Sequence, residues 1–322
     1  MTATANLVNQ FNVKANIGFN KKYIEFEPRL QNLFYEYNNG FVESTAFPFW
    51  LFLDTFEEFK GETKYQTFPE GYTFRVYNKA WSTGTQIKLE DFERASNVNG
   101  NALSRFNIYL DRIANYAIKA KDHPRELMFQ MIVNGTTNTY GTCFDQQVFF
   151  SGTHSYGITA GTENNIVTGT GTSLTQLETD IVSVMSRFAS FQYTQSPNGV
   201  VRGLNDDSDM KLLIVAPSQL FGQFHQLKTK SFFNNADNTV RDKFEFVTIP
   251  GFTDTNDWYA FITDGDQIMK PFLHQIEKVA ELTTPTMNDE SVKENKILKW
   301  SAYKRDNVAY GAWWRAIKVT NV

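Results

Sequence analysis

The sequence is poor in the features that mark disulfide-stapled, zinc-stapled and membrane proteins. Cys143 is the only cysteine in 322 residues, so an intrachain disulfide and a multi-cysteine zinc site are both excluded. The N-terminus lacks the charged start and apolar run of a secretory signal. The strongest apolar run, residues 47–53, is far shorter than the roughly 20 residues that cross a bilayer. We therefore expect no membrane partner.

No motif predicts an active site. The chain contains neither a GxxxxGK(S/T) phosphate loop nor a GxGxxG motif after a strand. Residues 153–157 (THSYG) resemble a nucleophile elbow only superficially, because Thr153 stands where the first glycine is required. The four histidines lie far apart, and the acidic run 205–209 lacks the glycine and glutamate of a calcium loop. We expect no enzyme and no catalytic, cofactor-binding or metal-binding residue, with a hydrolase using Ser155 and His154 as the enzymatic alternative.

The charge balance does not favour nucleic-acid binding. The chain has 31 Lys and Arg against 35 Asp and Glu, for a formal net charge of −4. Affinity for the phosphate backbone depends on basic residues, so strong sequence-independent binding is not expected. A protein that merely encloses DNA would also avoid a basic surface, so a DNA container is compatible with this charge.

Aromatic residues, in contrast, are abundant. They make up 15% of the chain, with 29 Phe and 6 Trp. Large aromatic side chains fill hydrophobic cores and also serve protein interfaces. The length suffices for two domains, or for one domain with large excursions.

Residues 57–90 are predicted to form a long two-stranded ribbon. Residues 69–71 (PEG) make a plausible turn, and residues 73–77 alternate polar and apolar as a two-faced strand does. An isolated hairpin is only marginally stable in water, so we expect this ribbon to lie on another copy of the same protein. The candidate contacts with the neighbouring subunit are Glu58, Lys60, Glu62, Lys64, Arg75, Lys79 and Trp81.

Residues 91–134 are predicted to form a long helix broken once. Pro124 lacks an N–H and disfavours helical geometry at His123, so the first segment should stop or kink there. Asp122 could cap a second segment that ends at Gly135. We therefore place a candidate bending point at His123 and Pro124. The apolar stripe of the first segment consists of Leu103, Phe106, Leu110, Ile113, Ala117 and Ala120.

The flanking segments carry weaker patterns. Residues 1–22 are polar and rich in asparagine, so we expect an extended arm that becomes ordered only against a partner. Residues 24–37 predict a short helix, residues 147–150 a short buried strand, and residues 282–296 a polar loop.

The second half of the chain predicts a mixed α/β body. Ser173 and Gln176 have the spacing of a capping box and open a helix. Residues 211–216 form an apolar run typical of a buried strand, and a helix should begin at Pro217. Further strands are expected at 244–249, 257–262, 297–304 and 310–319, with Trp313 and Trp314 buried.

Eight segments, taken in order, make the sequence resemble the Mu-like prophage major head subunit (gpT) family of tailed-phage capsid proteins, which has the Hong Kong 97-type fold. No single segment is specific, but the series keeps the family's order and rough spacing over about residues 57–320. The segments are 58–62 (EFKGE), 74–79 (FRVYNK), 123–127 (HPREL), 149–154 (FFSGTH), 212–220 (LLIVAPSQL), 258–259 (WY), 270–272 (KPF) and 310–315 (YGAWWR).

The resemblance implies an α+β chain with an N-terminal arm, an extended E-loop, a peripheral domain with a long spine helix, and an axial domain. The expected boundaries are 1–50 for the arm and lead-in, 57–90 for the E-loop, 91–199 for the peripheral domain, 200–290 for the axial domain, and 291–322 for strands that return to the peripheral domain.

The same resemblance implies the major capsid protein of a tailed double-stranded DNA bacteriophage or prophage. Pentamers and hexamers would close into an icosahedral shell in the host bacterial cytoplasm, around DNA that is not read by sequence. A separate scaffold and a portal are the expected partners, and no N-terminal cleavage is expected. Alternatives are an encapsulin-type shell that encloses enzymes, and a tail or adaptor component that forms rings.

Overall fold

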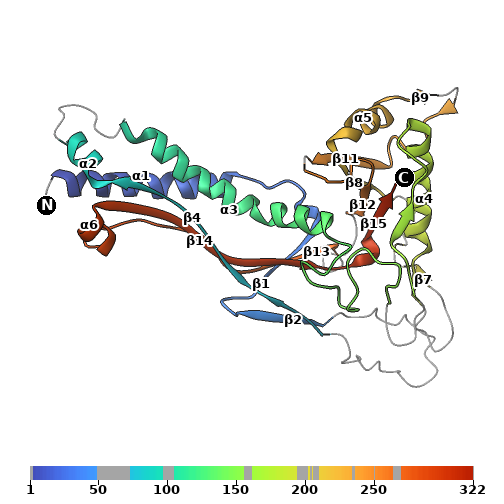
Figure 1. Cartoon of the computed structure of the whole chain (residues 1–322), viewed down its shortest axis with the longest axis horizontal. Coiled ribbons are helices and arrows are strands. Elements are labelled where there is room, and N and C mark those ends of the chain that lie inside the picture. The colour runs from blue at the N-terminus through green and yellow to red at the C-terminus, as the bar shows by residue number, and fades with distance from the viewer. Residues whose placement is uncertain are drawn as a thin grey trace, which may run out of the picture.

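The chain builds two bodies, each on its own sheet. The computed structural model describes residues 3–48, 73–96, 105–155, 162–193, 202–203, 205, 210–233, 236–249, 251–263 and 270–321. Within these ranges a four-stranded sheet forms a long body and a five-stranded sheet forms a compact body (Figure 1). The N-terminus lies at the far end of the long body, and the C-terminus lies in the compact body.

The long body rests on an antiparallel pair of strands. β13 (Phe272–Thr283) and β14 (Ile297–Tyr310) pair along most of its length. β4 (Lys79–Lys88) is antiparallel to β14 on one edge, and β1 (Phe34–Asn38) is parallel to β13 on the other. The resulting strand order is β1-β13-β14-β4.

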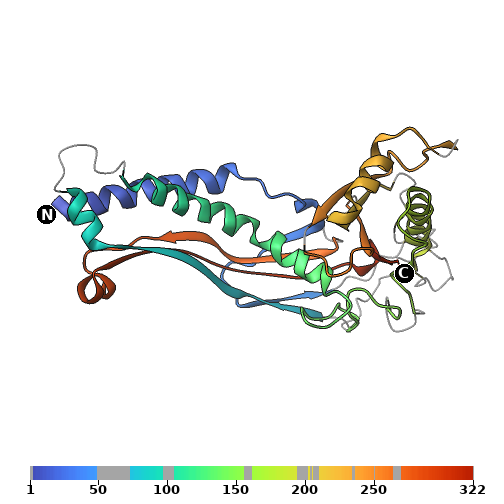
Figure 2. The same cartoon turned by 45° about the horizontal axis from the view of Figure 1, so that its top comes forward.

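Two long helices cover one face of this sheet (Figure 2). α1 (Ala3–Glu25) lies along α3 (Asn107–Val133), and a side chain added at Gly18 would approach Ala114 to 3.5 Å. At the far end, α2 (Leu89–Ser96) completes an aromatic core around Phe11. The ring of Phe11 lies 5.5, 5.9 and 5.0 Å from the rings of Phe92, Phe106 and Trp300.

The compact body has the strand order β11-β8-β12-β15-β5. Every residue of β8 and β12 is buried, as expected for strands inside a sheet with covered faces. Its elements are β5 (Ile166–Thr168), α4 (Leu174–Ser190), β8 (Leu212–Pro217), α5 (Phe221–Thr229), β11 (Phe244–Ile249), β12 (Trp258–Ile262) and β15 (Ala316–Thr320).

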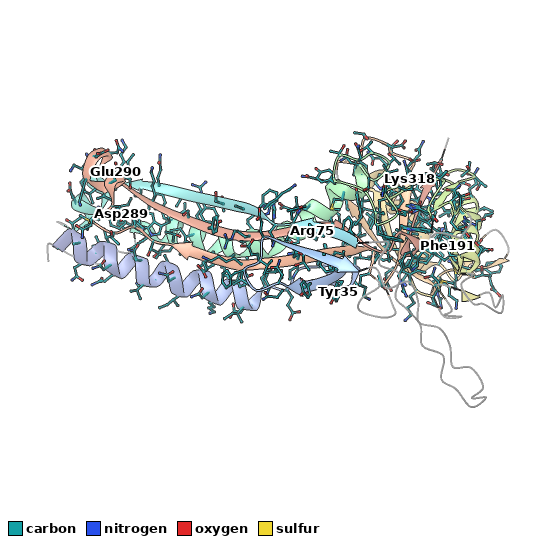
Figure 3. All side chains as sticks on the ribbon, turned by 90° about the horizontal axis from the view of Figure 1, so that it is seen from below. Tyr35, Arg75, Phe191, Asp289, Glu290 and Lys318 are labelled. Atoms are coloured by element: carbon teal, nitrogen blue, oxygen red, sulfur yellow. The ribbon has the colours of Figure 1, made fainter. Side chains whose placement is uncertain are left out.

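The remaining elements are short. They are β2 (Ser44–Pro48) paired with β3 (Thr73–Tyr77), β6 (Gln192–Tyr193) with β7 (Arg202–Gly203), β9 (Phe232–Phe233) with β10 (Ala236–Asp237), α6 (Glu290–Asn295), and 3-10 turns at Gln31–Leu33, Ser218–Leu220 and Trp313–Arg315. Asp289 and Glu290 lie at one end of the molecule, while Phe191 and Lys318 lie at the other (Figure 3).

Strongly patterned segments fold as predicted. The backbone N–H of Ser173 donates to Gln176 Oε1 at 3.1 Å, which completes the capping box of α4. Phe106, Ile113 and Ala117 are buried on one side of α3. The strands β8, β11 and β12 form where apolar runs predicted them, and Trp313 and Trp314 are buried. The α+β class is therefore confirmed.

The prediction of a two-stranded ribbon over residues 57–90 is wrong for its second half, because β3 and β4 pair with other strands. β3 pairs with β2, which precedes it in the chain, and β4 joins the sheet of the long body instead of a hairpin. β4 is mostly polar because it lies at a sheet edge, with one face toward solvent. Residues 49–72, which hold the predicted turn at 69–71, lie outside the described residues.

The prediction of an extended N-terminal arm is also wrong, because residues 3–25 form a helix that packs against the rest of the chain. Leu7, Phe11, Ala15 and Phe19 recur every four residues and are buried. The many asparagines between them conceal this stripe in the composition.

Three shorter predictions fail as well. The helix expected at 24–37 is absent: α1 ends at Glu25, a 3-10 turn spans Gln31–Leu33 and β1 begins at Phe34, although Leu33 and Phe34 are buried. Residues 147–150 form no strand but an irregular segment with bends, in which Phe149 and Phe150 are buried. The polar loop expected at 282–296 contains α6.

Sheet membership cuts across the expected domain boundaries. β13 falls within the stretch 200–290 but belongs to the sheet of the long body. β5 falls within 91–199, and β15 within 291–322, yet both belong to the sheet of the compact body.

We predict that Phe11→Ala lowers the free energy of unfolding of the unassembled subunit by about 3–5 kcal/mol, because it leaves a cavity among three rings. Val13→Ala, on the exposed side of the same helix, should change it by less than about 0.5 kcal/mol. Urea denaturation measures both values. Equal, small effects would show that α1 does not pack on its own chain.

Candidate functional site: a buried charge cluster beneath the long helix

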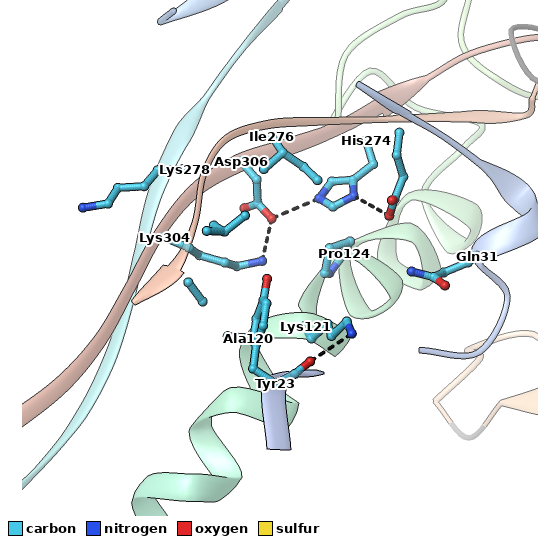
Figure 4. Close-up of a pocket in the computed structure, with 13 residues that line it drawn as sticks. Tyr23, Gln31, Ala120, Lys121, Pro124, His274, Ile276, Lys278, Lys304 and Asp306 are labelled. Carbon is cyan, nitrogen blue, oxygen red and sulfur yellow. Dashed lines mark hydrogen bonds and ion pairs between the residues drawn. The ribbon is translucent and has the colours of Figure 1, made fainter. Parts of the chain in front are cut away.

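Ionisable side chains from three strands of the long sheet meet beneath α3 (Figure 4). His274 of β13 has Nδ1 at 3.2 Å from Glu36 Oε1 of β1 and Nε2 at 3.1 Å from Asp306 Oδ2 of β14. Lys304 Nζ donates to the same Asp306 oxygen at 2.6 Å. Glu36 and His274 are direct neighbours in the β1–β13 register, and residues 304 and 306 share a face because strand side chains alternate.

Pairing outweighs burial for His274, Glu36 and Asp306, whereas burial lowers the pKa of Lys304 despite its contact with Asp306. His274, Lys304 and Asp306 are buried, whereas Glu36 is partly open to solvent. Burial favours the neutral ring of His274, but hydrogen bonds to Asp306 and Glu36 outweigh it and raise its pKa. The hydrogen bond from His274 lowers the pKa of Glu36. Burial opposes ionisation of Asp306, yet His274 and Lys304 lower its pKa.

A cavity of about 110 Å³ lies between this cluster and the helix. Its lining includes Tyr23 from α1 and Ala120, Lys121 and Pro124 from α3. Lys121 Nζ donates to the carbonyl oxygen of Tyr23 at 2.9 Å, which ties the two helices together beside the cavity. Pro124 has no N–H to donate to the Ala120 carbonyl, so one helical hydrogen bond is missing at this level.

The sheet is irregular at the same level. The β13–β14 register shifts between Ile276 and Lys278 and again between Lys278 and Glu281. Such bulges bend a strand locally and increase its twist. The missing helical hydrogen bond, the cavity and the bulges therefore lie at the same position along the length of the long body.

The helix prediction is partly wrong here. α3 continues through Pro124 without stopping. Asp122 is no cap, because its buried carboxylate pairs with Arg125 within the same helix. Gly135 follows the helix end, where a Cβ would meet the Phe150 ring at 2.6 Å. A bend at His123 and Pro124 stays a prediction.

His123 faces the edge strand of the sheet. Its ring lies 4.4 Å from the ring of Trp81. Burial disfavours the charged imidazole, and the charge of Lys304 adds to this effect, so the pKa of His123 falls to about 4. Trp81 Nε1 donates to the Asp306 carbonyl oxygen at 3.0 Å. Trp81 is therefore half-buried against its own chain.

The other predicted contact residues are more open or undescribed. Arg75 is exposed and donates to Ser44 Oγ at 3.2 Å. Lys79 is exposed at the start of the edge strand β4. Their contacts with a neighbouring subunit stay predictions. Glu58, Lys60, Glu62 and Lys64 lie outside the described residues.

Sequence reasoning missed Glu36, His274, Lys304 and Asp306. The first and last of them are separated by 270 positions, and no motif joins them. The only local signal was the two-residue spacing of Lys304 and Asp306 in an expected strand, which places two charges on one face.

The hydrolase alternative lacks the geometry of a nucleophile and base. His154 Nδ1 lies 2.7 Å from Asp145 Oδ2, and its Nε2 faces the Phe149 carbonyl oxygen at 3.2 Å. In a catalytic triad that second nitrogen would receive a serine proton. The imidazole also stacks on Trp313, with ring centroids 4.2 Å apart. His154 therefore ties loops to the core of the compact body.

Metal sites and membrane-spanning helices are both absent from the described ranges. No group of three or more His, Cys, Asp or Glu side chains there could hold a metal ion. Among the described helices, none combines the length and apolarity needed to cross a membrane.

We predict that Asp306→Ala lowers the free energy of unfolding by about 3–5 kcal/mol, because it leaves two buried cations without their acceptor. Glu36→Ala should cost about 1 kcal/mol or less, since that carboxylate is partly exposed. Chemical denaturation of the unassembled subunit measures both. Equal losses would contradict the central position of Asp306.

We also predict opposite pH effects for the two histidines. The raised pKa of His274 means that its contribution to stability is complete below its unfolded pKa of about 6.5 and is lost as pH rises through the folded value. The lowered pKa of His123 means that stability is lost as pH falls from about 6.5 to about 4. His274→Gln should remove the first dependence and His123→Gln the second. Wild-type pH profiles in both variants would contradict these assignments.

Comparisons with known proteins agree with the fold. The model of the family described as Mu-like prophage major head subunit gpT matches residues 39–184, slightly under half of the chain. No curated protein sequence matches. Solved capsid structures match nearly the whole chain at low sequence identity, and such matches show the fold only.

Three of these structures have comparable similarity. The procapsid protein of bacteriophage JBD30 is 14% identical, with a TM-score of 0.52, over 98% of this chain and 75% of that one. The mature capsid of bacteriophage PhiM1 is 8% identical, with a TM-score of 0.52, over 92% and 88%. The capsid of cyanophage P-SCSP1u is 9% identical, with a TM-score of 0.51, over 92% and 88%. The resemblance found in the sequence is thereby confirmed: residues 39–184 match the Mu-like prophage major head subunit gpT family, and the chain has the Hong Kong 97-type capsid fold.

Proposed function

We propose that this protein is the major capsid protein of a tailed double-stranded DNA bacteriophage or prophage. The observation that carries the proposal is the major head subunit match, which covers β2, β3, β4, α2, α3, β5 and part of α4, on a fold shared with phage capsids. In this role the chain is a structural protein of the virion, and its charge cluster supports the subunit instead of performing chemistry.

The shape of the subunit suits lateral assembly. The long body is elongated, and one face of its sheet is covered by α1 and α3 (Figure 2). Permanent assemblies bury on the order of 2,000–5,000 Å² per interface, and a slender subunit can supply such areas to several neighbours. Closed symmetry then saturates these surfaces.

The domain assignment follows the two sheets. We place the compact body, with β5, α4 and β15, as the axial domain around the symmetry axes. The long body is the peripheral domain, with α3 as its spine. We propose that the β2–β3 pair lies at the base of the E-loop, which contacts a neighbouring subunit.

The proposal includes partners. Pentamers and hexamers assemble in the host bacterial cytoplasm with a separate scaffold and a portal, and the shell encloses DNA without reading its sequence. The net charge of −4 is compatible with a container, because a chain without excess positive charge is not expected to bind the DNA backbone strongly.

Electron microscopy of the purified protein, together with sedimentation velocity, tests this function. We expect closed icosahedral shells. Rings would favour a tail or adaptor component, and shells that co-purify with an enzyme would favour the encapsulin-type alternative. A stable monomer at high concentration would contradict every assembly function.

In the same assay, reversal of Lys60 and Lys64 to Glu should prevent normal shells, because these charges are expected to pair with a neighbouring subunit. Lys14→Glu with Lys21→Glu provides the same change of net charge on the exposed side of α1. Normal heads from the Lys60 and Lys64 variant would reject the contact.

A further inference from the structure

The turn between β1 and β2 has an unusual backbone. We call residues 39–43 the Phe41 turn. Gly40 and Phe41 both have positive φ, at 59° and 68°. Glycine adopts this region freely, but for a bulky residue it is uncommon and costs about 1–2 kcal/mol. Strain that persists at one position points to a function for the residue that bears it.

Hydrogen bonds hold the turn in this conformation. The Val42 carbonyl oxygen accepts from Asn39 Nδ2 at 2.7 Å and from Asn78 Nδ2 at 3.0 Å. The Asn78 backbone N–H donates to the Glu43 carbonyl at 2.9 Å, and that of Asn39 donates to the Ile276 carbonyl at 3.0 Å. The turn is thus fixed to β13 and to the junction of β3 with β4, and a partner would not have to order it.

This fixed turn displays apolar side chains to solvent. Phe41 is 69% exposed and Val42 is 51% exposed. Tyr37, two residues before the turn, is also exposed. So is Tyr77, which pairs with Ser44 directly after the turn. No residue from 37 to 42 is charged, in a chain that is 20% charged. Aromatic residues without charge are the composition of interface cores.

We propose that the Phe41 turn is a contact with a second copy of this chain, in which Phe41 enters an apolar depression of the neighbouring subunit. This inference rests on the proposed function. The turn leads directly into β2, at the base of the E-loop that is proposed to contact a neighbour. β2 is five residues long, about 17 Å when extended, so the same neighbour lies within reach. Both views place the β2–β3 pair on the side of the sheet away from α1 and α3 (Figures 1 and 2).

Phe41→Gly separates folding from assembly. Glycine relieves the positive φ, so the stability of the unassembled subunit should stay the same or rise. The yield of closed shells should fall at least tenfold, because the apolar anchor is lost. Ile17→Ala is the control, since it removes an apolar side chain of similar exposure from α1, outside both the β2–β3 pair and the compact body, and it should leave shell yield near wild type.

Photo-crosslinking identifies the occupant. With p-benzoylphenylalanine in place of Phe41, irradiated shells should contain covalent dimers of this chain. Crosslinks to a different protein alone, or none in normal shells, would overturn the inference. Normal shell yield from Phe41→Gly would overturn it too, while the capsid function would stand. Absence of shells from the wild-type chain would instead contradict the proposed function and this inference with it.

Discussion

The rest of the structure depends on the antiparallel pairing of β13 with β14. The ladder crosses the long body and continues beyond both strands, where Gly311 and Ala312 donate to the carbonyls of Pro271 and Lys270 at 2.8 and 2.9 Å. A Cβ at Gly311 would meet the Lys270 carbonyl at 2.4 Å, so this close approach requires glycine. The chain then passes through Trp313–Arg315 into β15, which joins the compact sheet. One ladder therefore links the two bodies mechanically.

The charge cluster lies where this ladder is least regular. Bulges on β13 and the missing bond at Pro124 remove stabilisation from the sheet and from the helix at one level. The ion pairs of Asp306 with His274 and Lys304 hold β13 and β14 together there, and His274 ties in Glu36 of β1. Removing one partner of a buried ion pair strongly destabilises a protein. The cluster therefore joins the strands specifically at the position where the sheet and the helix of the long body are least regular.

The sequence correctly predicted the elements whose signals lie within a short stretch of the chain. The α4 capping box, the apolar stripe of α3 and the buried run of β8 each follow from spacing within a short window. α1 was missed because its stripe is diluted by asparagine, and β4 because its partner is more than 200 residues away. The cluster was missed for the same reason, since its members meet only through strand register. The fold was recognised because many short segments, each weak by itself, occur in the order typical of the family. This order cannot be found from the periodicity of any single segment.

The central proposal is that the subunit leaves surfaces for identical copies to cover, and that its E-loop, whose residues 49–72 lie outside the described residues, contacts a neighbouring subunit. A cryo-electron microscopy reconstruction of assembled particles tests it most directly. The account predicts a closed shell in which those residues run over an adjacent subunit. Density that folds them against their own long body, or a particle without subunit-crossing segments, would contradict it.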